Sequence, residues 1–141
     1  MFVAEILKTK GNAVFSIAPD LTVTQACAEL EQKRVGALVV CDGDQVVGVF
    51  SERDVVKALA ADGADALDRP VADYMTATVI YAEPAEEMSV LMTRMTDRRI
   101  RHLPVMQADR LVGVIAIGDV VKCQIAEHAH EAESLRTYIA G

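Results

Sequence analysis

Two segments of this chain combine the end of an apolar strand, the start of a helix and a carboxylate. In the first, residues 48–50 lead into Ser51, and Asp54 follows three residues later. Ser51 is placed to cap a helix, where free backbone N–H groups and the helix dipole favour an anion such as phosphate. A carboxylate on that first turn can accept hydrogen bonds from both hydroxyls of a ribose. The alternative is structural: Ser51 only caps the helix, and Asp54 only complements its dipole.

The same arrangement returns 65 positions later, where residues 113–122 repeat residues 48–57 and Asp119 takes the place of Asp54. Ten of the twenty positions from 38 to 57 are identical in the second copy. A shared helical pattern would explain matching apolar positions, but not a Gly and an Asp six apart in both copies. The repeat therefore predicts a paired structural unit, and the recurring Asp favours a ligand role.

A run of basic side chains precedes the second predicted hairpin. Arg98, Arg99, Arg101 and His102 fall within five residues of a chain whose formal net charge is -7. A guanidinium group matches the geometry of phosphate oxygens, so we expect Arg101 or His102 to contact phosphate. The alternative is a solvated helix end, where arginine complements the negative pole of the dipole.

The overall composition excludes several classes of protein. The acidic balance argues against a nucleic-acid surface, and no apolar run approaches the ~20 residues of a membrane span. Residues 1–8 lack the long apolar region of a signal peptide. These features predict a cytoplasmic protein without nucleic-acid or membrane partners.

The cysteines and the catalytic motifs point away from metal sites and enzymes. Cys27, Cys41 and Cys123 have no CxxC spacing, so we expect small buried side chains rather than a disulfide or a zinc site. His128 and His130 do not share a helix face, which argues against metal binding there. The chain carries no P-loop, dinucleotide fingerprint, HExxH or GxSxG motif, so we predict no catalytic residues and no metal.

Each half of the chain has the same predicted order of elements. A short apolar strand, an amphipathic helix with a Thr22–Gln25 capping box, a β-hairpin and a second helix follow one another. In the first half these fall at residues 13–17, 22–30, 37–50 and 51–60, and in the second at 79–81, 88–95, 103–115 and 119–139.

The predicted organisation is a first repeat at 2–66, a second at 70–125 and a helical tail at 126–141. Residues 3–7 and 71–75 form similar helical lead-ins to the two repeats. A core of about 60 residues is marginal alone, so the repeats should pack on each other as one module. The tail helix exceeds what the first repeat supplies, and we expect it to pack on a neighbour, such as another protomer.

These features resemble the cystathionine-β-synthase (CBS) domain family over roughly residues 2–125. The motifs that carry the resemblance are residues 51–54, 99–105 and 117–122, and residues 135–139 look like the tail helix of stand-alone bacterial two-CBS proteins. The resemblance implies a mixed α/β fold of the α+β type. Two βαββα units would be related by pseudo-two-fold symmetry, enclose two clefts (a Bateman module) and carry an extended C-terminal helix.

The resemblance also implies roles for individual residues. Asp54 and Asp119 would hold ribose hydroxyls, one in each cleft, with Ser51 near the ribose or phosphate of the first. Arg101 and His102 would meet phosphate in the Asp54 cleft. Further positions would contact phosphate in the other cleft (Arg53) or pack the adenine (Gly36, Ala37, Val79 and Ile100).

Two departures from the family pattern predict unequal clefts. Ala116 stands where the second repeat should have Ser or Thr, so that cleft lacks a hydroxyl. In the first repeat, Gly36 stands at the position that Arg101 holds in the second repeat, which leaves the second cleft with fewer cationic groups. Arg53, which would contact phosphate in the other cleft, partly offsets this difference in cationic groups. The Asp54 cleft is predicted to be the better equipped for a phosphorylated ligand.

The function that the resemblance implies is regulatory rather than enzymatic. The module would bind AMP, ADP, ATP, NAD(H) or S-adenosylmethionine, form a disc-shaped homodimer and pass its ligand state to an unidentified regulated protein. One alternative is a ligand-free dimerisation scaffold, and another is a small nucleotide hydrolase. The hydrolase lacks support because no metal-binding carboxylate cluster or evident nucleophile is present.

Overall fold

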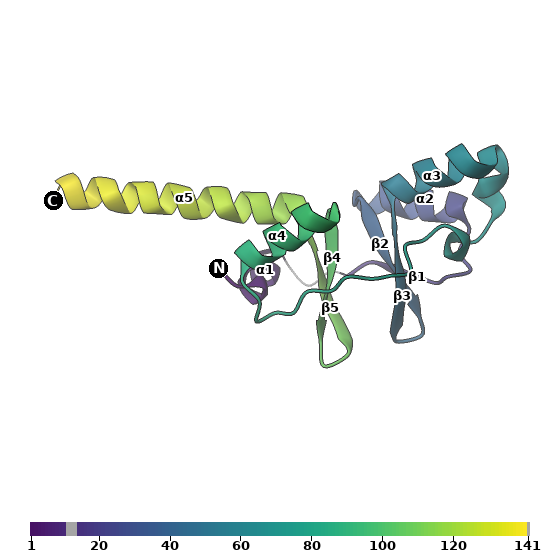
Figure 1. Ribbon diagram of the computed structural model, residues 1–141, viewed down its shortest axis with the longest axis horizontal. Helices are drawn as coiled ribbons and strands as arrows, with labels where there is room; N and C mark the ends of the chain where they lie inside the picture. Colours follow the sequence, from purple (N-terminus) through teal and green to yellow (C-terminus); the bar gives the residue numbers. More distant parts are fainter. Residues whose placement is uncertain (11–13, 141) are drawn as a thin grey trace.

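The computed structural model describes residues 1–10 and 14–140, which form a mixed α+β fold with two β-hairpins (Figure 1). The first sheet has the order β1-β2-β3, and the second consists of β4 and β5. The strands are β1 (Ser16–Ile17), β2 (Ala37–Asp42), β3 (Gln45–Ser51), β4 (His102–Gln107) and β5 (Arg110–Ala116). The helices are α1 (Val3–Lys10), α2 (Val23–Lys33), α3 (Glu52–Asp62), α4 (Met88–Arg98) and α5 (Ile117–Ala140). Two 3-10 helices, η1 (Gly63–Asp68) and η2 (Val71–Asp73), connect the repeats.

The two hairpins share one register, which confirms the repeat seen in the sequence. Ala37 pairs with Ser51, and His102 pairs with Ala116 at the equivalent position of the second hairpin. Both hairpins also carry a register shift at the same point, after Val40 and after Val105. The predicted elements of each hairpin therefore form as expected, with strands one or two residues longer.

The predicted helix starts at Thr22 and Ser51 are confirmed, and the structure shows a capping box at each. The Gln25 N–H donates to Thr22 Oγ1 at 3.1 Å, and the Thr22 N–H donates to Gln25 Oε1 at 3.0 Å. Ser51 and Asp54 make the equivalent pair at the start of α3. Each box satisfies N–H groups that a helix start otherwise leaves unpaired.

The expected first strands of the two repeats differ. The apolar stretch predicted at 13–17 begins outside the described residues, and its described part contains β1. The strand predicted at 79–81 is wrong, because only a single parallel bridge forms there, between Ala82 and Val105. In the first repeat the Val39 N–H donates to the Phe15 carbonyl at 3.3 Å. Its counterpart, Pro104, has no N–H to donate, and this shortens the second ladder.

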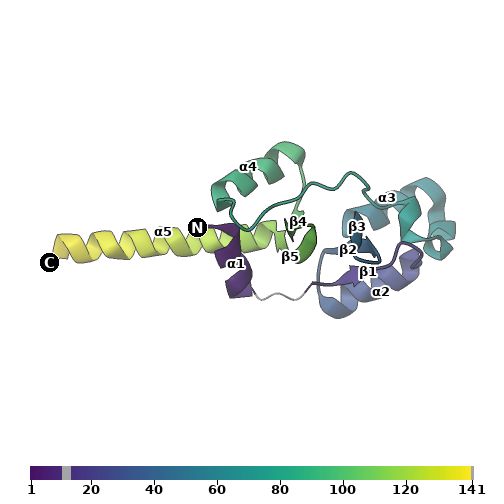
Figure 2. The same cartoon turned by 90° about the horizontal axis from the view of Figure 1, so that it is seen from below.

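The two lead-in segments cross over, so that each completes the core of the other repeat. Helix α1 packs on the second hairpin, and Figures 1 and 2 both show it beside α5 in that half. The buried cluster there joins Val3, Ile6 and Leu7 to residues such as Leu103 and Ile115. Reciprocally, Val71 lies buried in the core of the first repeat.

Backbone hydrogen bonds repeat this crossing with the same geometry. The Val3 N–H donates to the Glu86 carbonyl at 2.9 Å, and the Val71 N–H donates to the Leu21 carbonyl at 2.8 Å. Leu21 and Glu86 are 65 residues apart, which is the offset of the repeat. The pseudo-two-fold relation thus extends from the hairpins to the lead-ins.

The repeated glycines Gly48 and Gly113 leave room for these lead-ins. A Cβ on Gly48 would lie 2.6 Å from Met75 Sδ and 3.0 Å from the Thr76 carbonyl oxygen. A Cβ on Gly113 would collide with the side chain of Leu7, which is itself buried. Both glycines are therefore required by close approach of the crossing segment.

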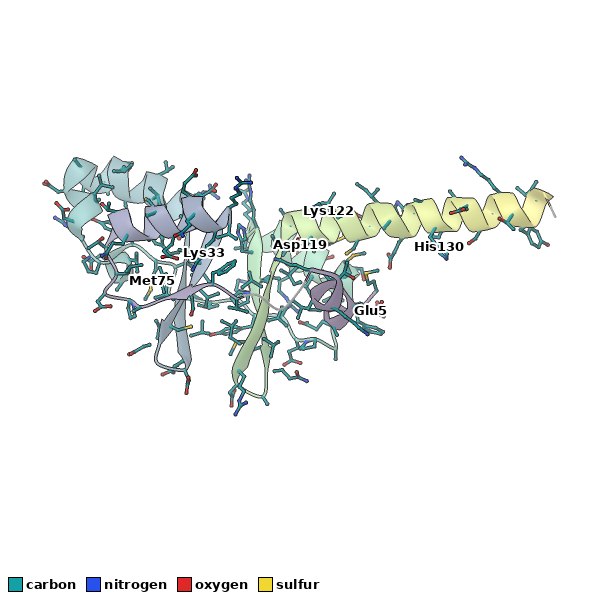
Figure 3. The ribbon with its side chains drawn as sticks, turned by 180° about the vertical axis from the view of Figure 1, so that it is seen from behind. Glu5, Lys33, Met75, Asp119, Lys122 and His130 are labelled. Carbon is teal, nitrogen blue, oxygen red and sulfur yellow. The ribbon has the colours of Figure 1, made fainter. Side chains whose placement is uncertain are left out.

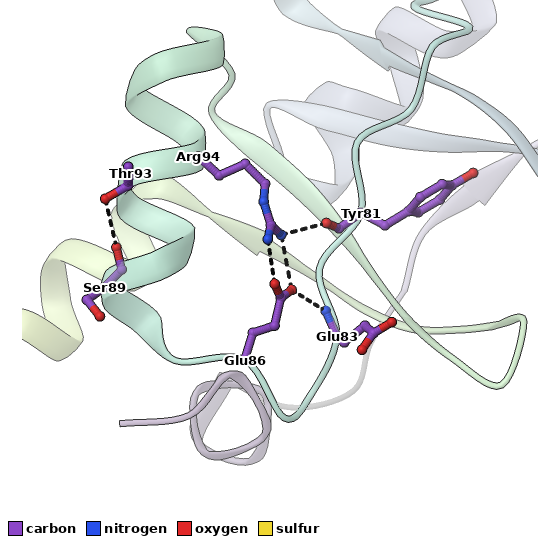
Figure 4. A network of polar contacts seen from close by, with 6 residues as sticks. All are labelled: Tyr81, Glu83, Glu86, Ser89, Thr93 and Arg94. Carbon is purple, nitrogen blue, oxygen red and sulfur yellow. Dashed lines mark hydrogen bonds and ion pairs between the residues drawn. The ribbon is translucent and has the colours of Figure 1, made fainter.

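A polar network holds the segment that receives the N-terminus (Figure 4). Arg94 on α4 forms a bidentate ion pair with Glu86 and donates to the Tyr81 carbonyl at 2.8 Å. The Glu83 N–H donates to Glu86 Oε2 at 2.8 Å. The hydrogen bonds from Arg94 lower the pKa of Glu86 below its ordinary value. The network fixes the loop whose carbonyls accept from the start of α1.

The part of the chain described by the structure contains no helix that is both long and apolar enough to span a membrane. The three cysteines are free, as expected, but half-buried rather than fully buried.

Gly113→Ala tests the crossing. The added methyl group must displace the buried Leu7 side chain, and overpacking of this kind typically costs about 1–3 kcal/mol of unfolding free energy. Gly118→Ala is the matched control, because apart from its chain neighbours and its own helix backbone no atom of the described residues lies within 4 Å of its Cβ position. This variant should be neutral or stabilising by up to about 1 kcal/mol. Chemical denaturation measures both. Equal unfolding free energies for the two variants would contradict the close approach.

Candidate functional site

Asp54 lies at the start of α3 with one carboxylate oxygen already engaged. Its Oδ2 accepts from the Ser51 N–H at 2.9 Å and from the Ser51 hydroxyl at 3.1 Å. The residue is only 4% exposed. Among the described residues, every fully buried side-chain oxygen or nitrogen has a hydrogen-bond partner. Because Oδ1 accepts no hydrogen bond from the described residues, this oxygen must still reach solvent. Asp54 is therefore fixed by Ser51 through Oδ2, and its Oδ1 forms no hydrogen bond with another described residue.

Asp119 occupies the equivalent position at the start of α5 but has a different environment. Its Oδ2 accepts from the Ala116 N–H at 2.9 Å, as Asp54 does from Ser51. The same oxygen pairs with Lys10 Nζ at 2.7 Å, and Lys10 also donates to the Val114 carbonyl at 2.7 Å. Asp119 lies where α5 meets the body (Figure 3). A lysine from the crossing lead-in thus neutralises the second carboxylate.

His102 connects the two repeats. A Cβ built on Gly36 would lie 3.1 Å from the His102 ring and 3.8 Å from Glu52 Oε1, so the ring packs against the entrance to β2 and α3. Burial lowers the pKa of His102, and the positive charge of Lys10 lowers it further. Glu52 and Asp119 act in the opposite direction. The imidazole therefore faces charged groups from both repeats.

In both repeats, a backbone hydrogen bond joins the start of the helix after the hairpin to the residue just before the hairpin's first strand. The Glu52 N–H donates to the Gly36 carbonyl at 3.0 Å, and the Ile117 N–H donates to the Arg101 carbonyl at 2.8 Å. Gly36 and Arg101 thus hold equivalent backbone positions. A hollow of about 460 Å³ opens beside Gly36 and Glu52, with Val35 and Val55 in its lining.

The predicted site residues fall into two groups and several outliers. Ser51 with Asp54, and Gly36 with His102, are in contact; Ala37 starts β2 opposite Ser51. The remaining predicted residues lie outside these two pairs. Asp119 pairs with Lys10, Arg53 and Arg101 are exposed, and Val79 and Ile100 are half-buried, with Ile100 against the core of the second repeat.

Two residues near the site, Lys10 and Glu52, are not marked by any sequence pattern. Lys10 reaches Asp119 across 109 positions of sequence, and no local pattern marks that contact. Glu52 stands next to Ser51 in the predicted helix start, and its proximity to His102 follows only from the packing of the two repeats. Among the described residues, no three His, Cys, Asp or Glu side chains are grouped as metal ligands.

Comparison with known proteins assigns both repeats. Residues 3–61 and 71–126 each match the family model of the CBS domain. The mitochondrial CBS domain-containing protein CBSX3 of Arabidopsis thaliana is 34% identical over 148 residues, covering 99% of this chain and 72% of that protein.

Solved structures agree with this assignment. A CBS-domain containing protein from Agrobacterium tumefaciens has a TM-score of 0.86 and 41% identity, covering 88% of this chain and 99% of that one. A CBS domain protein from Pyrobaculum aerophilum, solved in complex with AMP, has a TM-score of 0.75 and 28% identity over 84% of this chain and 89% of that one. With two matched repeats that fill most of its length, the chain belongs to the CBS domain family as a CBS-domain pair.

Proposed function

We propose that this protein is a non-enzymatic regulatory module that binds an adenosine-containing ligand between its repeats. Asp54 carries the proposal: a buried, fixed carboxylate with one oxygen open, at a helix start that favours phosphate. The AMP complex of the related Pyrobaculum aerophilum protein supports an adenine nucleotide as ligand. AMP, ADP, ATP, NAD(H) and S-adenosylmethionine are the candidates.

The Asp54 side is the better site for a phosphorylated ligand. Asp119 is already paired with Lys10 at 2.7 Å, so an ammonium group neutralises the second carboxylate, whereas Asp54 forms no ion pair with another described residue. Ser51 adds a hydroxyl that Ala116 cannot supply. In this proposal Arg101 and His102 contact the phosphate at the Asp54 side, and Gly36, Ala37, Val79 and Ile100 lie near the adenine.

Ligand binding would act by changing how the two repeats are arranged relative to each other. A ligand held by Asp54 from one repeat and by His102 from the other favours the repeat arrangement that satisfies both, which is a population shift. Coupling of this kind is typically ~1–3 kcal/mol. The recipient of the signal is a regulated protein partner, and the module is proposed to act in the cytoplasm.

The helical side of the molecule suits a homodimer. Helices α2, α3, α4 and the first part of α5 lie on the side opposite the hairpin turns (Figure 1). Large apolar side chains are exposed on three of these helices: Val56 and Leu59 on α3, Val90 on α4 and Val121 on α5. Burial of these side chains between two copies would remove them from water.

A thermal-shift screen with the five ligand types tests the binding function. At one hundred times the dissociation constant, a ligand is expected to stabilise the protein by ~2.7 kcal/mol. Asp54→Ala should weaken binding by about tenfold or more, since a hydrogen bond to a charged group contributes about 1.5–3 kcal/mol.

Gln25→Ala is the matched control for Asp54→Ala. It removes the equivalent capping acceptor from α2, away from the site, so it should lower stability through the lost cap and leave ligand affinity unchanged. If no ligand raises the melting temperature of nucleotide-free protein, the scaffold function replaces this proposal. Equal affinity in Asp54→Ala and wild type would remove Asp54 from the site.

The protonation of His102 tests the phosphate contact. Its pKa lies below the ordinary value of 6.5, mainly through burial and then through Lys10. A bound phosphate adds negative charge and should raise this pKa, so affinity should increase as pH falls through the interval between the free and bound values.

NMR titration of His102 with and without AMP measures this shift directly. Lys10→Met should raise the pKa of His102 in the free protein, because a nearby positive charge is lost, whereas Lys8→Met on the exposed side of α1 should not. A His102 pKa that AMP leaves unchanged, at saturating ligand, would place the phosphate elsewhere.

A further inference from the structure

The distal part of α5 has no packing partner among the residues that the structure describes. The Met1 ammonium pairs with Glu127 at 3.2 Å, and every residue from 128 to 139 is exposed. The helix continues as a straight rod away from the body, with His130 on its projecting part (Figures 1 and 3). Isolated helical segments of about 12–15 residues are marginal in water, so this segment needs a packing surface.

One face of α5 carries a heptad pattern. Val121, Ile125, His128, Ala132, Leu135 and Ile139 follow one another at intervals of four, three, four, three and four residues. A period of 3.5 residues is the pattern of helices that pair as a coiled coil, rather than of a helix packed on a globular core. We call these six positions the seam.

The seam is accessible to a partner helix. Val121, Ile125, Leu135 and Ile139 are 43%, 63%, 60% and 81% exposed. The residues that contact the body, such as Val120 and Glu127, lie on a different face, roughly a third of a turn away at 3.6 residues per turn. A second helix can therefore approach the seam without displacing the body of its own protomer.

The charges beside the seam select the partner and its direction. In a parallel pair of α5 helices, Glu131 of each copy faces Arg136 of the other, since residues five apart flank the seam on opposite sides. In an antiparallel pair with full seam overlap, Lys122 would face Arg136, and Glu131 would face Glu131. Glu131 and Arg136 form no ion pair with other described residues, so both are available.

We propose that residues 121–139 of α5 pair with the same segment of a second copy as a parallel two-stranded coiled coil. The pairing is isologous, with its two-fold axis along the helices, so both bodies lie at the same end. This inference specifies the proposed homodimer and is independent of ligand binding in the clefts.

Disulfide trapping in the full-length chain tests both pairing and direction. In a background with Cys27, Cys41 and Cys123 changed to Ala, Ile125→Cys and Leu135→Cys are oxidised separately. Each should form a covalent dimer at least tenfold faster than Ser134→Cys, which lies on the opposite face of α5. In an antiparallel pair, position 125 of one copy would face position 135 of the other, so covalent dimers would form mainly when the two variants are mixed. That result would overturn the proposal, and so would rates equal to those of the Ser134→Cys control.

A charge exchange in the native cysteine background provides a second measurement. Arg136→Glu should raise the dissociation constant of the dimer about tenfold or more in sedimentation equilibrium, and the double variant Glu131→Arg, Arg136→Glu should restore it. A dissociation constant that Arg136→Glu leaves unchanged would contradict the parallel pairing. Thermal shifts with nucleotide, measured on the same variants, report the cleft function separately.

Discussion

The structure depends on the exchange of lead-in segments between the two repeats. Leu7 of the first lead-in fills the space that Gly113 leaves open, and Met75 of the second does the same at Gly48. Each repeat alone would lose buried apolar surface and the backbone hydrogen bonds at its helix start. Since a core of about 60 residues is marginal, the exchange makes one cooperative module from two incomplete ones.

The same exchange makes the two candidate sites unequal. Helix α1 continues to Lys10 and delivers its ammonium group to Asp119, whereas the second lead-in is a short 3-10 helix followed by Thr76. The Thr76 backbone instead pairs with Val49, with hydrogen bonds of 3.0 and 2.9 Å. A cation therefore reaches one acidic helix start through a length difference between lead-ins, whereas Asp54 forms no ion pair with another described residue.

Much of the local structure could be predicted from residues a few positions apart. The capping box at Thr22, the helix start at Ser51 and the two hairpins depend on spacings of two to four residues, and they form where expected. The strand at 79–81 failed because its partner position is Pro104, and a missing N–H matters only once the pairing partner is known. The connection between the repeats contains the 3-10 helix Gly63–Asp68, whose Ala66 is fully buried.

The sequence by itself determined that the chain is a duplicated α+β unit, where its helices start and which residues mark its candidate sites. It did so because caps, turns and strand alternation are local, and because duplication leaves a fixed offset of 65 residues. Only the tertiary structure decided which repeat each lead-in completes, that Lys10 neutralises Asp119 and that His102 packs on Gly36. Those contacts join residues far apart in the sequence, such as Lys10 and Asp119 at 109 positions, and packing, rather than any local pattern, selects them.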